Sequence, residues 1–302
     1  MSSNFADRLT AAIKQKGTPI CVGLDPRIEQ IPSFIRDVYL AKDGEETPAA
    51  VADTFIEFNK GIIDVVADLV PVVKPQFAFY LRYGSQGVRA FEETCAYAQQ
   101  AGLIVLADAK SNDIGSTAQA YAEGFLGADA PLSCDALTVN AYLGADGIKP
   151  FTELCKKNGK GVFVLVKTSN PSSGDLQDRI TDGEKMSIHE LMAHFVESWG
   201  ADEMGESGYS SVGAVVGATY PQEAARLREI MPHAYFLVPG YGAQGGGAAD
   251  VKPCFDSQGG GALVNSSRGI IFAWEKDCKE RNYQDSAREA VEEMKKDLAS
   301  VL

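Results

Sequence analysis

The chain has little positive charge and no long hydrophobic run. Its 302 residues contain 28 Lys and Arg against 41 Asp and Glu, for a net charge of −13, which disfavours nonspecific binding to nucleic acid or to an anionic membrane. Asp64 and Asp68 interrupt even the apolar run 61–73, so no membrane-spanning helix is expected. The segment 1–17 lacks the basic and apolar regions of a secretory leader, and a cytoplasmic protein is expected.

Metal-binding and disulfide patterns are also missing. The six cysteines show no CxxC spacing, and several lie in apolar strand-like runs, so reduced thiols are expected. Of the three histidines, His189 and His194 lie five apart in a polar, helix-like segment, which is more typical of packing or surface residues than of a zinc site. The sequence therefore predicts no zinc site.

Short apolar runs alternate with helix-like segments along the whole chain. The segments between them carry helical spacing, as in Phe55, Phe58, Ile62 and Val66 or in Leu191, Phe195 and Trp199. Eight parallel β units of this kind predict a (β/α)₈ barrel, with an open doubly wound sheet as the alternative. The candidate strands are 19–24, 72–79, 103–108, 136–140, 161–167, 211–217, 235–240 and 262–267.

Two insertions and two flanking helices complete the predicted architecture. Most strands begin about 25 to 30 residues apart, which is the size of a compact βα unit, but insertions are needed at 27–49 and 168–185. A helix over 4–17 carries one apolar stripe of Phe5, Leu9 and Ile13, and a C-terminal helix carries another, of Ala287, Val291, Met294 and Leu298. The length alone allows one large domain or two ordinary ones; we predict a single catalytic barrel over residues 1–302.

Polar residues follow almost every candidate strand. In a barrel of this type the catalytic groups lie at the carboxyl ends of the strands, so the positions converge on one candidate site. They are Asp25, Lys74, Asp108, Lys110, Asn140, Thr168 and Ser169.

The segment 103–118, "LIVLADAKSNDIGSTA", has the densest chemistry. Strand alternation places Asp108 and Lys110 on one side, and Asp113 lies beyond the turn, where it can cap the following helix. A lysine between carboxylates stays cationic and can stabilise and then protonate a carbanion. Lys74 from the neighbouring strand extends the group to a Lys–Asp–Lys–Asp array. The plainer interpretation is a helix cap with a solvated ion pair.

The segment 238–250 contains Gly240, Gly242 and Gly245 in a formal GxGxxG pattern. It is a weak dinucleotide motif, because it lies late in the chain and more glycine follows it. A phosphate loop fits better, since barrels bind phosphate after strands seven and eight, where Arg268 can be the partner and Gln244 can reach the ligand as the loop closes. The plainer alternative is a flexible surface loop with Arg268 in a structural salt bridge.

These motifs together resemble the orotidine 5′-phosphate decarboxylase family, in its longer (type 2) subgroup. The resemblance runs nearly end to end, through "CVGLDPR", "VVKPQFAFY", "DAKSNDIGSTA", "VNAYLG", "VLVKTSNPSSGDLQ", "LVPGYGAQGG" and "VNSSRGI". It implies a (β/α)₈ homodimer that converts orotidine 5′-phosphate to uridine 5′-phosphate and CO₂ in de novo pyrimidine biosynthesis, without metal or organic cofactor.

The resemblance also implies roles for individual residues. Lys110 would donate the proton to C6, Asp108 would lie beside the departing CO₂, and Lys74 and Asp113 would complete the array, with Asp113 acting in the partner's site. The implied substrate contacts are Asp25 and, from the other subunit, Thr117 at the ribose, Thr168 or Ser169 at the pyrimidine, Gln244 and Arg268 at the phosphate, and Gln76 and Asn140 nearby. Ser111 and Asn112 depart from the basic residue and glycine common in relatives, which puts only dimer contacts in question.

Two other functions fit parts of the pattern. Metal-dependent sugar-phosphate lyases or aldolases of the same superfamily share the DxKxxD pattern, but they place an acid where Lys74 stands. A nucleotide-binding barrel without catalysis would bind uridine 5′-phosphate and turn nothing over, which leaves the lysine and aspartate array without a purpose.

Overall fold

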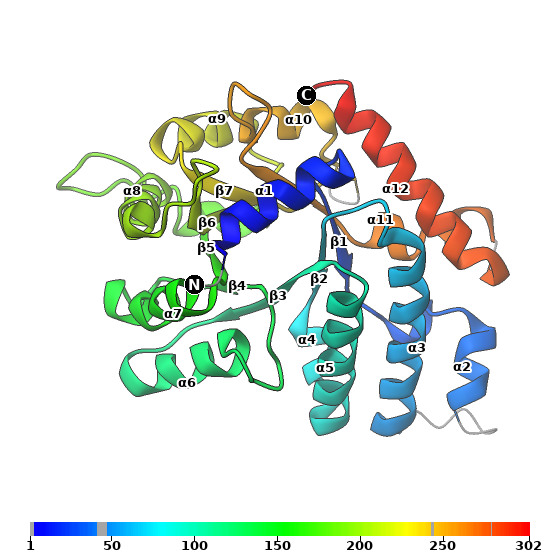
Figure 1. Ribbon diagram of the computed structural model, residues 1–302. Helices are drawn as coiled ribbons and strands as arrows, with labels where there is room; N and C mark the ends of the chain where they lie inside the picture. The colour runs from blue at the N-terminus through cyan, green and yellow to red at the C-terminus, as the bar shows by residue number, and fades with distance from the viewer. Residues whose placement is uncertain (1–2, 41–46, 243–244, 279) are drawn as a thin grey trace.

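The strands close into a barrel (Figure 1). The computed structural model describes residues 3–40, 47–242, 245–278 and 280–302, and within them eight parallel strands pair in chain order, with β8 paired to β1. The (β/α)₈ prediction is confirmed and the open sheet is wrong. The strands are β1 (Ile20–Leu24), β2 (Val72–Pro75), β3 (Ile104–Ser111), β4 (Ala136–Val139), β5 (Gly161–Lys167), β6 (Ser210–Val216), β7 (Ala234–Val238) and β8 (Ala262–Ser266).

Helices surround this barrel (Figure 1), and short 3₁₀ turns lie in the connecting segments. The helices are α1 (Phe5–Lys16), α2 (Ser33–Tyr39), α3 (Pro48–Val66), α4 (Phe77–Leu81), α5 (Gly84–Gln100), α6 (Gly115–Leu126), α7 (Ala145–Asn158), α8 (Ile188–Gly200), α9 (Pro221–Ile230), α10 (Ala248–Val251), α11 (Arg268–Ile271) and α12 (Tyr283–Ala299). The 3₁₀ turns are η1 (Ile28–Gln30), η2 (Pro171–Asp175), η3 (Ala201–Glu203), η4 (Lys252–Cys254), η5 (Ala273–Asp277) and η6 (Glu280–Asn282).

Two strands differ from the predicted ranges by more than two residues at one end. β2 stops at Pro75, because α4 begins at Phe77 with Gln76 as its N-cap. β3 continues to Ser111, and its register with β4 shifts between Ala107 and Ser111. A bulge of this kind re-aims side chains, and it lies in the segment that carries Asp108 and Lys110.

Alternation along the strands separates the barrel interior from the helical layer. One buried cluster holds Cys21, Val72, Leu106, Ala136, Phe163, Val215, Leu237 and Leu263. Their strand neighbours, such as Val22, Val73 and Val105, belong to a second cluster that includes the helices. Since successive side chains point to opposite faces, residues two positions beyond an interior residue face the inside of the barrel again.

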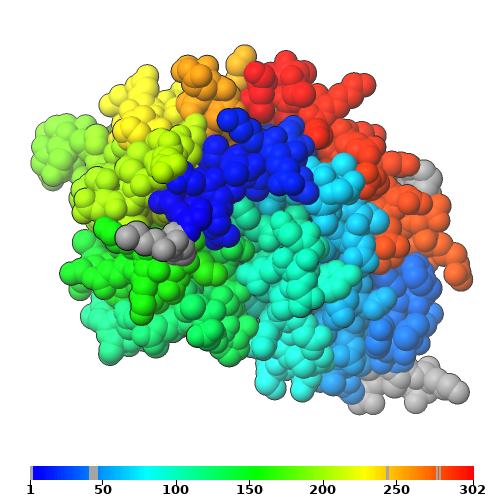
Figure 2. All heavy atoms as spheres, viewed as in Figure 1, coloured from blue at the N-terminus to red at the C-terminus, as the bar shows by residue number. Residues whose placement is uncertain are grey.

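Helix α1 closes one end of the barrel. Its predicted stripe packs inward, and the rings of Phe5 and Phe163 meet edge to face with their centroids 6.2 Å apart. The guanidinium of Arg8 lies 2.8 Å from the carboxylate of Asp135, the residue before β4. Figure 2 shows the N-terminal segment covering the middle of this face. The amino ends of the strands are therefore covered, and the carboxyl ends are left for the site.

The two flanking helices are as predicted, whereas the packing of the barrel helix α8 is not. In α1, Asn4 caps the first turn and Gly17 ends the helix at φ 63°, and the C-terminal stripe is buried on α12. In α8, the buried residues are His189, Ala193, Val196 and Gly200, not the predicted stripe of Leu191, Phe195 and Trp199. Phe195 is 43% exposed and stacks on Trp199 with ring centroids 5.7 Å apart, and Trp199 is partly buried against the core.

The cysteines and the hydropathy of the helices fit the expectations from sequence. All six cysteines lie in the described part of the chain and none forms a disulfide; only Cys278 is exposed. No helix among the described residues is both long enough and apolar enough to cross a membrane.

Candidate active site

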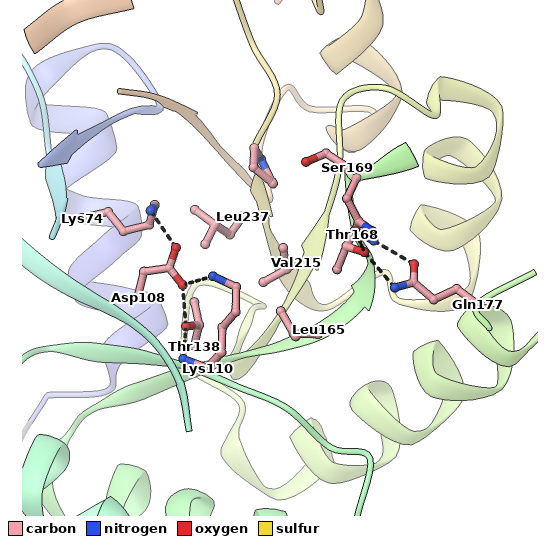
Figure 3. A pocket seen from close by; sticks show the side chains of 12 residues that line it. Lys74, Asp108, Lys110, Thr138, Leu165, Thr168, Ser169, Gln177, Val215 and Leu237 are labelled. Carbon is pink, nitrogen blue, oxygen red and sulfur yellow. Dashed lines mark hydrogen bonds and ion pairs between the residues drawn. The ribbon is translucent and has the colours of Figure 1, made fainter. Parts of the chain in front are cut away.

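A cavity of about 410 Å³ opens at the carboxyl ends of the strands (Figure 3). Lys74, Asp108, Thr138 and Leu165 line it, and each lies two residues beyond an interior residue of its strand. Figure 3 shows the charged residues on one side and Thr168, Ser169 and Gln177 on the opposite side. Strand alternation thus explains why polar and charged side chains of separate strands face one space.

Asp108 lies at the centre of the charged group. One carboxylate oxygen accepts hydrogen bonds from Lys74 Nζ at 2.8 Å and Gln76 Nε2 at 2.9 Å. The other accepts from Lys110 Nζ at 2.6 Å and Thr138 Oγ1 at 2.8 Å. The predicted association of Asp108 with both lysines is confirmed, and the bonding capacity of the carboxylate is filled.

The electrostatics of this group favour the charged forms. Burial alone would raise the pKa of Asp108, but the charges of Lys74 and Lys110 outweigh it and hold that pKa well below its usual range. Burial would likewise lower the pKa of Lys74, yet Asp108 and Asp25 hold it above its ordinary value. Asp108 is therefore a carboxylate and Lys74 an ammonium near neutral pH.

Lys110 has an unusual backbone conformation. Its φ is 50°, in the left-handed region that residues with a side chain rarely occupy, and its N–H donates to Thr138 Oγ1 at 3.0 Å. Thr138 therefore contacts both the backbone of Lys110 and the side chain of Asp108. Strain held in this way at a cavity wall is typical of a functional residue.

A second cavity adjoins the first and shares Lys74, Asp108 and Pro239 with it. Three polar atoms in this cavity are buried and have no hydrogen-bond partner in the described part of the chain. They are Oδ1 of Asp25, Oδ1 of Asn265 and Oγ of Ser267. Buried polar atoms are nearly always paired in folded proteins, so these three mark a surface made for a polar ligand.

The far end of the second cavity is cationic. Arg27 and Arg268 line it together with Gly240, which has φ 106°, and Tyr241. Such a combination of guanidinium groups and a glycine-rich backbone suits a phosphate. Gly240 and Arg268, from the segments after β7 and β8, thus line one cavity, whereas Gln244 lies outside the described residues. Phosphate binding by this pair stays a prediction.

Asp113 and Thr117 do not line either cavity. Asp113 accepts a hydrogen bond from the N–H of Ile114 at 2.7 Å, so the predicted helix cap is wrong: Ile114 is the N-cap of α6, and no side chain bonds there. Thr117 is exposed beside an apolar hollow formed by Phe77, Tyr121, Phe125 and Leu132. Within one chain, Asp113 is not part of the charged array.

The loop after β5 contributes Thr168 and Ser169 to the first cavity, as expected. Gln177 joins them from nine residues further on, accepting from the N–H of Thr168 at 3.0 Å and donating to its hydroxyl at 2.7 Å. Asn140 is different, since its side chain accepts from the N–H of Tyr142 at 3.0 Å and shapes a turn. From β4, the cavity is lined by Thr138 instead.

Sequence reasoning missed several lining residues. Thr138 and Asn265 each lie two residues after an interior position, so strict alternation could have indicated them. Arg27 stands in the first motif, three residues after β1 ends. Gln177 is the last residue of the motif "VLVKTSNPSSGDLQ", but its distance from β5 along the chain gave no reason to place it at the cavity.

The fold and the site together define a class of protein: a (β/α)₈-barrel enzyme with a lysine–carboxylate–lysine centre and an adjoining cavity suited to a polar, anionic ligand. Across the described ranges, no three His, Cys, Asp or Glu side chains gather as a metal site would require.

Comparison with known proteins identifies the family. Residues 18–279 match the model of the orotidine 5′-phosphate decarboxylase / HUMPS family. An orotidine 5′-phosphate decarboxylase of Rhodopirellula baltica is 47% identical over 97% of this chain and 98% of its own, and one of Caldicellulosiruptor bescii is 44% identical over 90% of each. The structure of the Leishmania donovani OMP decarboxylase is similar, with a TM-score of 0.73 at 31% identity over 97% of this chain and 98% of that one. The chain belongs to this family and is a decarboxylase.

Proposed function

We propose that this chain converts orotidine 5′-phosphate to uridine 5′-phosphate and CO₂, as a cytoplasmic, cofactor-free step of pyrimidine biosynthesis, and that residues 1–302 act as one catalytic domain. One observation carries the mechanism: Asp108 lies 2.8 Å from Lys74 Nζ and 2.6 Å from Lys110 Nζ at the cavity wall. The names of the relatives support the substrate.

Lys110 is the proton donor in this mechanism. Breaking the bond between C6 and the carboxylate releases CO₂ and leaves an electron pair on C6, with no neighbouring π system to accept it. A preorganised cation stabilises such a charge. The ammonium of Lys110, the more exposed of the two lysines, then transfers a proton to C6 and is protonated again from solvent.

Asp108 acts on the substrate carboxylate. A buried anion beside the departing group raises the energy of the charged ground state relative to a transition state that is losing its charge. Lys74 and Gln76 hold Asp108 in place from its other oxygen. Asp108 therefore orients Lys110 and favours the release of neutral CO₂.

The two cavities divide the substrate between them. The pyrimidine would lie in the first cavity against Thr168 and Ser169, and the ribose hydroxyls would pair with Asp25, whose Oδ1 is buried without a partner in the described chain. The phosphate would contact Arg268 and the glycine-rich loop, with Gln244 closing over it. Binding energy from this remote group helps to order the site for catalysis.

A homodimer would complete each site. Asp113 and Thr117 would reach the partner's substrate, since neither lines the two cavities that would hold the substrate in its own chain. The apolar hollow beside Thr117 supports this arrangement, because Tyr121 is 44% exposed there and Ile114 is 51% exposed at the start of the same helix. Exposed apolar surface of this kind is typical of an interface.

The test is the loss of orotidine 5′-phosphate absorbance with purified protein in excess EDTA. Turnover under this condition is expected, because no step of the mechanism uses a metal. If activity appeared only with a divalent metal and a sugar phosphate, the chain would belong with the lyases. If it bound uridine 5′-phosphate and turned over neither substrate, the binding-protein function would replace this proposal.

A further inference from the structure

Lys167 is a fully buried lysine that the proposed mechanism does not use. It ends β5, one residue before Thr168, and its side chain is 0% exposed. Its ammonium lies 2.6 Å from Asp178 Oδ1 and 4.3 Å from the centre of the Tyr220 ring. Burying an ammonium is costly unless it is paired. The role of Lys167 therefore depends on the residues that its ion pair with Asp178 holds in place.

The pair joins the two ends of the loop after β5. Asp178 is adjacent to Gln177, and the side-chain amide of Gln177 bonds the backbone and hydroxyl of Thr168. Lys167, Asp178, Gln177 and Thr168 thus form a closed ring of contacts and bonds. The loop from 168 to 177 is tied at its base, so its cavity-facing residues have a defined position.

His189 supports the same ring from helix α8. Its Nδ1 lies 2.9 Å from the carbonyl oxygen of Gln177 and 3.2 Å from Asp178 Oδ1, and its backbone N–H donates to the same carbonyl at 3.0 Å. A carbonyl only accepts, so Nδ1 carries the hydrogen. The loop is therefore held by strand β5 through Lys167 and by helix α8 through His189.

The segment between β6 and α9 packs against the loop. Tyr220 lies under Lys167, and its hydroxyl donates to the carbonyl of Asn170 at 3.4 Å. Gly217 approaches so closely that a Cβ there would lie 2.9 Å from Cα and Cβ of Ser169. The position of Ser169 is thus set both by the ring and by a close backbone contact.

We propose that Lys167 is a positioning residue that, through Asp178 and Gln177, holds Thr168 and Ser169 against the pyrimidine of the substrate. The inference rests on the proposed function, which puts the base at this loop. It predicts an effect confined to ligands that carry a base. Small displacements of positioning groups are costly for catalysis, about a hundredfold for 1 Å.

The experiment compares Lys167→Met and Asp178→Asn with wild type, with Lys185→Met as the control because Lys185 is an exposed lysine of the same insertion. Calorimetry measures binding of uridine 5′-phosphate and of ribose 5-phosphate, which lacks the base, and kinetics with orotidine 5′-phosphate separate kcat from KM. We expect both variants to bind uridine 5′-phosphate about tenfold more weakly and ribose 5-phosphate within about twofold of wild type. Lys185→Met should match wild type.

The double variant and Gly217→Ala extend the test. Because the pair acts as a unit, Lys167→Met with Asp178→Asn should lose no more than the worse single variant. Gly217→Ala displaces Ser169 while the ring stays intact, and it should give the same base-specific loss. If Lys167→Met does not fold, Asp178→Asn and Gly217→Ala decide, since the Asp178 side chain is 48% exposed.

Two results would overturn the inference alone: unchanged uridine 5′-phosphate binding in the folded variants, or an equal loss for both ligands, which would indicate a general structural role. Wild-type protein that binds ribose 5-phosphate but not uridine 5′-phosphate would overturn the proposed function and this inference together.

Discussion

Asp108 shows how a single residue can be both buried and charged. Two ammonium groups, an amide and a hydroxyl, all in the described chain, donate to its carboxylate. Removing one partner from a buried pair is far more damaging than the pair is stabilising, because the remaining charge is left without compensation. The charged group is therefore preorganised, and replacing one of its buried members should be strongly destabilising.

The depressed pKa of Asp108 predicts a pH dependence of stability. Because its folded pKa lies below the unfolded value of about 3.9, the group contributes stability that is present above that value and is lost as pH falls through the folded pKa. The free energy of unfolding, measured in urea, should fall from pH 7 to pH 3 by about 1 kcal/mol or more further in wild type than in Asp108→Asn. A difference that stays constant over this range would contradict the shifted pKa.

At the scale of elements, the two ends of the barrel have separate tasks. The carboxyl ends carry the cavities, whereas Arg228 of α9 joins the amino ends of β7 and β8. Its guanidinium, 8% exposed, donates to the carbonyls of Met231, Ala234, Cys254 and Gly261 and lies 3.6 Å from the centre of the Phe236 ring. Burial lowers the pKa of Arg228 to about 10, so it stays charged at neutral pH.

Arg228→Met should destabilise the fold without changing the chemistry. Four buried carbonyls lose the Arg228 donor, and of these the carbonyls of Met231 and Gly261 keep a backbone N–H donor. We expect a loss of about 3 kcal/mol or more in the free energy of unfolding, measured by chemical denaturation. Arg226→Met is the control, since Arg226 lies on the same helix in exposed ion pairs and its replacement should leave the free energy of unfolding close to that of wild type. A large fall in kcat of the folded Arg228→Met protein would show that this end of the barrel is not independent of the site.

For the whole molecule, a net charge of −13 coexists with a locally cationic cleft. Lys74, Lys110, Arg27 and Arg268 come from separate parts of the chain and line the two adjoining cavities. Low-dielectric walls focus such a local potential and attract an anionic substrate in spite of the acidic surface. Closure of the barrel is what concentrates these charges.

The proposed dimer predicts complementation between inactive subunits. Lys110→Ala and Asp113→Ala proteins should each be nearly inactive, yet a mixture that exchanges subunits should recover about one quarter of wild-type activity, because half the dimers then hold one intact site. Mixing Lys110→Ala with Arg268→Ala is the control and should recover nothing, since both residues act in their own subunit. No recovery in the first mixture, with mixed dimers present, would remove Asp113 from the partner's site.

Several features were readable from local sequence because they depend on short periods. All eight strands, both flanking helices and the association of Lys74, Asp108 and Lys110 were predicted and are observed. The strand period of two and the position of polar residues after apolar runs contain this information. The roles of Asp113, Thr117 and Gln244 stay predictions, because a second chain or residues outside the described ranges would have to be present to test them.

Other features depend on contacts between segments that are far apart in the chain. The sequence alone determined the alternation of strands and helices and the charged group of Lys74, Asp108 and Lys110. Only the tertiary structure decided that β8 closes on β1, that Thr138 contacts both Asp108 and Lys110, and that Lys167 pairs with Asp178. The stripe on α8 was misjudged for the same reason, since an amphipathic pattern does not state which face a neighbour covers. Local periodicity is a property of the backbone, whereas register, loop paths and partner faces are set by how all elements pack at once.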